Sequence, residues 1–99
     1  MVKIKPILPG EILEEEFLIP MGISSYRLAK DIKISATRVS EILKGKRRIT
    51  VDTALRLSRY FGNSVEFWVG IQVDYEIRKA KKELENQLAQ IKQLDAMTA

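Results

Sequence analysis

Two helical patterns that are too short to be stable alone place the strongest constraint on this chain of 99 residues. Within residues 24–50, apolar residues recur at helical spacing over 26–32 and again over 35–44. An isolated helix of fewer than about 12 residues is barely populated in water. Both segments must therefore bury their apolar sides against other helices of the same chain.

The rest of the sequence predicts three further helices. Pro9-Gly10-Glu11 is typical of a first helical turn, and Pro20-Met21-Gly22 ends that helix. Thr50 caps a helix over 51–61, and Ser64 begins a fifth. A brief apolar alternation at the amino terminus is interrupted by proline and leaves an arm rather than a strand. The sequence therefore predicts an all-α fold of five helices.

Capping residues mark the ends of the two short helices. Ser24 or Ser25 caps the first, Ser35 caps the second, and Gly45 ends the second in a left-handed conformation. Lys33 lies between them, where a left-handed Gly or Asn is usual, and a side chain there costs about 1 kcal/mol. Either its ammonium offsets this cost by reaching a phosphate, or the strain is simply tolerated.

The fifth helix has the longest apolar pattern. Its candidate dimer contacts are Phe67, Trp68, Ile71, Tyr75, Ile77 and Leu84. Ile77, Leu84 and Ile91 recur every seven residues, as in a coiled coil. We expect one helix of about thirty residues, which either packs on its own domain or pairs with a second copy or a partner groove. Trp68 is either a core residue or an interface anchor.

Composition excludes several kinds of site. The chain has no Cys, which excludes a disulfide or a thiolate metal site, and no His, which removes the usual zinc ligand and the usual general base. No apolar run approaches the roughly 20 residues of a membrane span. We therefore expect no catalytic residue, no metal, no cofactor and no membrane partner, and we expect a cytoplasmic location.

The basic charge of the chain is concentrated in one segment. The formal net charge is +4, but residues 24–50 carry eight Lys or Arg against Asp31 and Glu41, which gives +6. Residues 1–23 have a net charge of −2, and the remaining segments balance. A localised basic patch is expected of a protein that binds a polyanion, and the alternative is a solvated, Lys-rich surface.

The twenty residues from Ser25 to Lys44 have the spacing of a helix-turn-helix. Their apolar or small residues are Leu28, Ala29, Ile32, Ile34, Val39 and Ile42. Two short helices that cross steeply need a small contact residue on the first, and Ala29 fits that position. The second helix then turns a polar face outward, which a major groove about 12 Å wide can accept. A plain helical hairpin has similar spacing, but the basic charge in the same window favours DNA binding.

Motifs outside this DNA-reading unit are more selective than its spacing. They are P-G-E-I-L-E-E-E-F-L at 9–18, G-K-R-R-I-T at 45–50, R-Y-F-G at 59–62 and E-F-W at 66–68. Over about residues 9–80, the chain resembles the HigA (VapI-type) antitoxins of the Xre/Cro helix-turn-helix group. The resemblance implies a lambda-repressor-like DNA-binding domain, in an antitoxin that binds its own operator as a homodimer. It also implies neutralisation of a HigB-like toxin that cleaves mRNA.

Carried onto this sequence, the recognition helix is Ser35–Lys44. The candidate base-reading residues are Ala36, Thr37, Arg38, Ser40 and Glu41. Arg38 either reads a guanine with two hydrogen bonds or contacts a phosphate. Glu41 either accepts from a cytosine or holds Arg38 in place. The candidate phosphate contacts are Ser24, Ser25, Tyr26, Lys33, Lys44, Lys46, Arg47 and Arg48.

We expect a DNA-binding domain over residues 1–70, with its motif at 25–44, and a helical extension over 71–99 for dimerisation or partner contact. Two alternatives to the antitoxin remain open. One is a transcriptional repressor of the same fold that has no toxin partner. The other is an interaction module whose basic face binds an acidic protein.

Overall fold

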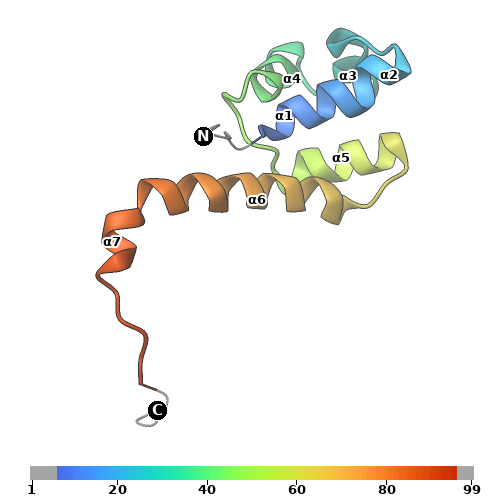
Figure 1. The fold of residues 1–99 in the computed structure, drawn as a ribbon. Helices are drawn as coiled ribbons and strands as arrows, with labels where there is room; N and C mark the ends of the chain where they lie inside the picture. The colour runs from blue at the N-terminus through green and yellow to red at the C-terminus, as the bar shows by residue number, and fades with distance from the viewer. Residues whose placement is uncertain (1–6, 96–99) are drawn as a thin grey trace.

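The structure, a computed structural model, describes residues 7–95, which form helices joined by short turns and a non-helical segment after α7 (Figure 1). The helices are α1 Pro9–Ile12, α2 Ile19–Met21, α3 Ser25–Ile32, α4 Ala36–Leu43, α5 Val51–Phe61, α6 Val65–Glu83 and α7 Glu85–Ala89. A π-helical stretch, Leu13–Leu18, joins α1 to α2, so the predicted first helix is continuous. The all-α prediction is confirmed, and the expected arm falls mostly on residues 1–6, outside the described part of the chain.

The predicted capping residues are confirmed. The hydroxyls that accept a hydrogen bond from the backbone N–H three residues on are those of Ser24, Ser35, Thr50 and Ser64. Ser25 is the first residue of α3 rather than its cap. Lys33 has φ 62° and is the only non-glycine residue within 7–95 with a positive φ, as its position predicted. Gly45, with φ 76°, follows the last turn of α4 as expected.

Trp68 lies at the centre of the core. Its side chain is 0% exposed and packs on Phe17, with ring centroids 4.8 Å apart. The indole Nε1 donates a hydrogen bond of 2.8 Å to Oδ1 of Asn63, so the one polar atom of the ring has a partner. Of the two roles that the sequence left open, Trp68 has the core role. Its prediction as a dimer contact is wrong, because the side chain has no exposed surface that a second copy could contact.

The predicted helix of about thirty residues is wrong at its carboxyl end. Helix α6 has 19 residues and ends at Glu83, and Leu84 separates it from the five residues of α7. Residues 81–95 are all exposed, so no tertiary contact offsets the entropy lost on ordering them as a helix. Ile91 lies beyond α7 and is 71% exposed, so the seven-residue repeat does not continue along one helix.

Helix α6 is tied to the loop between α4 and α5 through a buried glutamine. The side-chain oxygen of Gln72 accepts from the backbone N–H of Ile49 at 2.8 Å, and its nitrogen donates to Glu76 at 3.1 Å. Glu76 also accepts two hydrogen bonds from Arg48, at 2.7 and 3.1 Å. These bonds join the basic loop to α6 at positions beyond residue 70.

Gly10 permits the closest approach between the first helix and α4. A Cβ added at Gly10 would collide with the backbone carbonyl of Ile42 and lie 2.8 Å from Cα of Leu43. Both obstacles are backbone atoms, which cannot move aside as a flexible side chain can. Only glycine therefore allows α4 to pack at this distance from α1.

We expect Gly10→Ala to lower the free energy of unfolding by about 1–3 kcal/mol, the usual range for overpacking. Gly70→Ala is the matched control, because a Cβ at Gly70 meets nothing within 4 Å and alanine favours a helix interior by about 0.5–1 kcal/mol. Urea unfolding of the two variants should give shifts of opposite sign. Equal shifts would show that the contact between α1 and α4 is not tight.

The Glu76 pair predicts a defined dependence of stability on pH. Its hydrogen bond with Arg48 is the main reason that the pKa of Glu76 is lower than usual. A carboxyl with a depressed pKa stabilises the fold above its unfolded pKa, and this contribution is lost as pH falls through the folded pKa. Glu76→Gln should therefore be less stable than the natural chain at pH 7, and the difference should shrink below about pH 4.5. A difference that stays constant from pH 7 to pH 2.5 would contradict this assignment.

Candidate nucleic-acid interface

Helices α3 and α4 form the predicted hairpin. They lie at the top of the bundle in Figure 1, while α6 runs along its base. Leu28, Ala29 and Ile32 of α3 are buried, as are Val39 and Ile42 of α4, and Ile34 in the turn is half-buried. The apolar spacing therefore correctly predicted which sides of the two helices face the core.

The outward face of α4 is partly open and partly committed to contacts within the chain. Ala36 and Thr37, at its start, are exposed, whereas Arg38, Ser40 and Glu41 are half-buried. The hydroxyl cap of Ser35 is used within α4, because it accepts from the N–H of Arg38 at 3.1 Å. Ala36 and Thr37 are thus the most accessible of the predicted base-reading residues.

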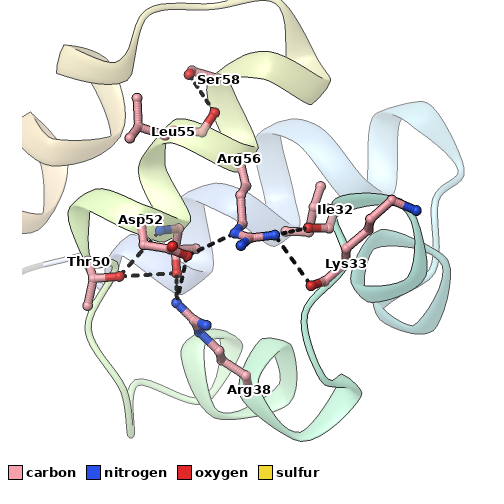
Figure 2. A network of polar contacts seen from close by, with 9 residues as sticks. Ile32, Lys33, Arg38, Thr50, Asp52, Leu55, Arg56 and Ser58 are labelled. Carbon is pink, nitrogen blue, oxygen red and sulfur yellow. Dashed lines mark hydrogen bonds and ion pairs between the residues drawn. The ribbon is translucent and has the colours of Figure 1, made fainter.

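Arg38 is held by the amino-terminal turn of α5 (Figure 2). Its Nη2 donates to Oδ1 of Asp52 at 3.2 Å and to the hydroxyl of Thr53 at 2.7 Å, and its side chain is 28% exposed. The sequence had left open that Glu41 holds Arg38, and this alternative is wrong. Glu41 instead accepts from Nε of Arg47 at 2.9 Å.

A second arginine connects Asp52 to the turn of the hairpin. Nε of Arg56 donates to Oδ1 of Asp52 at 2.9 Å, while its Nη1 donates to the backbone carbonyl of Ile32 at 2.9 Å and to that of Lys33 at 3.4 Å (Figure 2). Arg56 thereby satisfies carbonyls at the end of α3 that no later turn of the helix can satisfy. The hydrogen bond from Arg56 is the main reason that the pKa of Asp52 is lower than usual.

Asp52 and Arg56 were not among the predicted site residues. Their i, i+4 spacing does indicate a helical ion pair. Asp52 is 14 residues from Arg38 in sequence, and Arg56 is 24 residues from Ile32, so no local pattern indicates these contacts.

Tyr60 makes a further tie between α5 and the hairpin. Its hydroxyl donates to Oδ2 of Asp31 at 2.5 Å, and Arg27 forms an ion pair of 3.4 Å with the same carboxylate. The hydrogen bond from Tyr60 is the largest of the effects that lower the pKa of Asp31, and it raises the pKa of Tyr60 itself. Asp31 is therefore ionised at neutral pH and holds the outer side of α3 against α5.

The basic residues of 24–50 divide by type. All four arginines pair with a carboxylate of this chain: Arg27 with Asp31, Arg38 with Asp52, Arg47 with Glu41 and Arg48 with Glu76. The four lysines have no ion-pair partner among residues 7–95, and they are Lys30, Lys33, Lys44 and Lys46. All four lysines are exposed. The lysines are thus the basic residues of 24–50 that have no ion-pair partner among residues 7–95.

The remaining predicted phosphate contacts lie at the amino end of α3. Ser24, Ser25 and Tyr26 are exposed there, and Tyr26 is 72% exposed. The amino end of a helix presents unpaired N–H groups and a partial positive charge, which suit a phosphate. One of these groups, the N–H of Arg27, is already bonded to the Ser24 hydroxyl at 3.0 Å.

Two other kinds of feature are not found in the described part of the chain. Over residues 7–95, no helix has both the length and the apolar character needed to cross a membrane. The same residues contain no group of three or more acidic, His or Cys side chains that is suited to hold a metal ion.

Comparison with known proteins gives consistent matches. A family model described as helix-turn-helix matches residues 15–68. Virulence-associated protein I of Dichelobacter nodosus is 48% identical over 77 residues, which are 78% of this chain and 71% of that protein. Antitoxin HigA-1 of Vibrio cholerae is 40% identical over 70 residues, which are 71% of this chain and 66% of that protein.

A solved structure extends the similarity to nearly the whole fold. The structure of Pseudomonas aeruginosa antitoxin HigA with the higBA promoter matches with a TM-score of 0.88 and 40% identity, over 92% of this chain and 100% of that one. The hairpin of α3 and α4, the long α6 and the sequence motifs thus agree with the same family assignment. The chain belongs to the Xre-type helix-turn-helix family of HigA-type antitoxins and DNA-binding regulators.

Proposed function

We propose that this chain is the antitoxin of a HigBA-type module, which binds the operator of its own operon as a homodimer and neutralises a HigB-like mRNA-cleaving toxin. The observation that carries the DNA-binding part is the set of four exposed lysines in and next to the hairpin of α3 and α4, none of which has a carboxylate partner among residues 7–95. The relative from Pseudomonas aeruginosa, solved with the higBA promoter, supports the same assignment.

In this proposal α4 enters the major groove and the lysines hold the phosphates on either side. Ala36 and Thr37 meet base edges at the start of α4, and Arg38, in the same first turn, reads a base. Lys44 and Lys46 follow α4 and contact the backbone of the DNA, together with the amino end of α3. The phosphate contacts supply affinity, and the base contacts supply the choice of sequence.

The homodimer part of the proposal rests on α6. Val73 and Ile77 are 40% and 50% exposed and lie one turn apart on one side of α6, and Leu84, directly after the end of α6, is 43% exposed. Phe67 is 38% exposed near the start of the same helix, while Ile71 and Tyr75 are half-buried. A second copy that covers this stripe would remove it from water and would place two recognition helices on one operator.

Toxin neutralisation is supported by membership of the family, and one experiment tests it together with operator binding. The chain is co-expressed with the protein encoded beside it and purified, and the complex is used to footprint the DNA upstream. We expect co-purification of a small basic ribonuclease and a footprint with two-fold symmetry.

The outcomes separate the alternatives. A footprint without a co-purified toxin would favour a repressor that has no toxin partner. Binding with no preference for duplex DNA over other polyanions would favour an interaction module for acidic proteins.

The free lysines should determine how DNA affinity depends on salt. Replacing Lys44 and Lys46 with Gln should reduce the slope of log K against log salt by about 0.9 for each phosphate that the variant no longer neutralises. Lys81→Gln with Lys82→Gln is the matched control, because it removes the same charge from the exposed end of α6. If both double variants have the same slope, Lys44 and Lys46 lie outside the interface.

The dimer assignment predicts that a charge on the α6 stripe separates the two copies. Ile77→Lys should sediment as a monomer at concentrations where the natural chain is a dimer, because pairing would bury an unpaired charge. Ile91→Lys is the control, since Ile91 lies beyond α7. An Ile77→Lys chain that remains a dimer would place the interface elsewhere.

A further inference from the structure

The side chain of Arg38 makes its hydrogen bonds within residues 7–95 through a single nitrogen. Nη2 donates to both Asp52 and Thr53, which leaves Nε and Nη1 without a partner among residues 7–95. A guanidinium forms its two-bond fork from Nη2 together with either Nη1 or Nε. While Nη2 is bonded to Asp52 and Thr53, Arg38 can donate to DNA only from Nε and Nη1, as separate hydrogen bonds. A two-bond fork would require Nη2 to leave Asp52 and Thr53.

Asp52 is the residue on which this arrangement depends. Its Oδ1 accepts from Arg38 at 3.2 Å and from Arg56 at 2.9 Å, so one oxygen joins the two arginines (Figure 2). Arg56 is in turn bonded to the turn carbonyl of Ile32. Asp52 thus connects the recognition helix, the turn that precedes it and the first turn of α5.

Thr53 provides a second, independent acceptor beside Asp52. Its side chain is 1% exposed, and its hydroxyl accepts from Nη2 of Arg38 at 2.7 Å. The cap hydroxyl of Thr50 lies 3.3 Å from the same oxygen. A buried acceptor of this kind has little freedom to follow a moving guanidinium, so it defines one position for Nη2.

Holding an arginine in advance has a direct consequence for sequence reading. A free arginine side chain loses rotamer entropy when it is ordered. A phosphate accepts a guanidinium from many directions, whereas a base edge rewards one orientation only. Restraint of Arg38 therefore favours recognition of a base much more than general affinity for DNA.

We propose that Asp52, which is not itself a base contact, is a specificity-determining positioning residue that orients Arg38 toward one base pair of the operator. This inference rests on the proposed operator binding. It predicts that Asp52 controls the preference at the base pair read by Arg38 and has little effect on binding to unrelated DNA.

The test compares full-length variants by fluorescence anisotropy at one salt concentration. The probes are the footprinted operator, the set of its single base-pair variants and an unrelated duplex. Arg38→Ala identifies the base pair that Arg38 reads, where preference should fall about tenfold, within the range for one base contact. Asp52→Asn and Thr53→Val should each reduce preference at that same base pair by about fivefold or more. Asp52→Asn should cause no further loss in the Arg38→Ala background.

Asp74→Asn is the matched control. Asp74 forms an exposed i, i+4 ion pair with Arg78 on α6, just as Asp52 does with Arg56 on α5. Both changes remove one negative charge from an exposed helical pair, so an effect seen only with Asp52→Asn belongs to its position. Thermal unfolding followed by circular dichroism shows that each variant is folded at the assay temperature.

The readout separates positioning from a loss of structure. A smaller folded fraction weakens binding to every duplex by the same factor, so the ratio between two duplexes does not change. The proposal is overturned if Asp52→Asn keeps the natural preference at that base pair, or if it weakens binding to all duplexes equally. It is also overturned if Arg38→Ala loses affinity equally on every sequence. In each of these three cases the proposed operator binding stands. If the natural chain does not distinguish the upstream DNA from the unrelated duplex, the proposed function fails and the inference fails with it.

Discussion

The packing of α3 and α4 on each other, with the first helix against α4 and α5 against α3, is the constraint on which the rest of the structure depends. Each of these two helices has eight residues, so neither would persist in water without tertiary contacts. Leu28, Val39 and Leu57 are almost fully buried and supply the apolar contacts. Polar ties then set the orientation of the pair: Tyr60 reaches Asp31 on α3, and Arg56 reaches the turn between α3 and α4. Helix α4 therefore depends on α3 and the first helix for its packing, and polar contacts from α5 fix its orientation.

Local features of this fold could be predicted from sequence, and contacts between distant segments could not. The four hydroxyl caps and the left-handed Lys33 follow from neighbouring residues, and all were confirmed. The buried sides of α3 and α4 follow from periodicity. Gln72 was missed because its partner, the N–H of Ile49, is 23 residues away, and a polar residue within an amphipathic helix gives no sign of being buried. The carboxyl end of α6 was predicted too far along the chain, because the apolar pattern continues through residues 81–95, which do not pack on the rest of the domain.

The same limit applies to the candidate interface. Charge and spacing located the basic face and its exposed lysines, but charge alone does not distinguish a paired cation from a free one. Four arginines counted toward the +6 of residues 24–50 are paired with Asp31, Glu41, Asp52 or Glu76. Two of these acids, Asp52 and Glu76, lie outside that window. The field that a DNA phosphate meets on this face is therefore weaker than the count suggests, and it is concentrated at the lysines.

The division of the basic residues into paired arginines and unpaired lysines has an energetic consequence for DNA binding. An arginine that contacts DNA from this face must first leave a carboxylate or share it, which costs up to about 1 kcal/mol for an exposed pair. A free lysine has no such cost and acts as a mobile point charge, so it suits the phosphate backbone. An arginine that stays bonded to its carboxylate can place its guanidinium in fewer positions. It therefore contacts fewer DNA groups but distinguishes better between them. Arg38, with a buried hydroxyl as its second acceptor, is the most restrained of the four. In the proposed interface, the lysines hold the DNA and the restrained Arg38 chooses its sequence, so the two roles divide by residue type as well as by position.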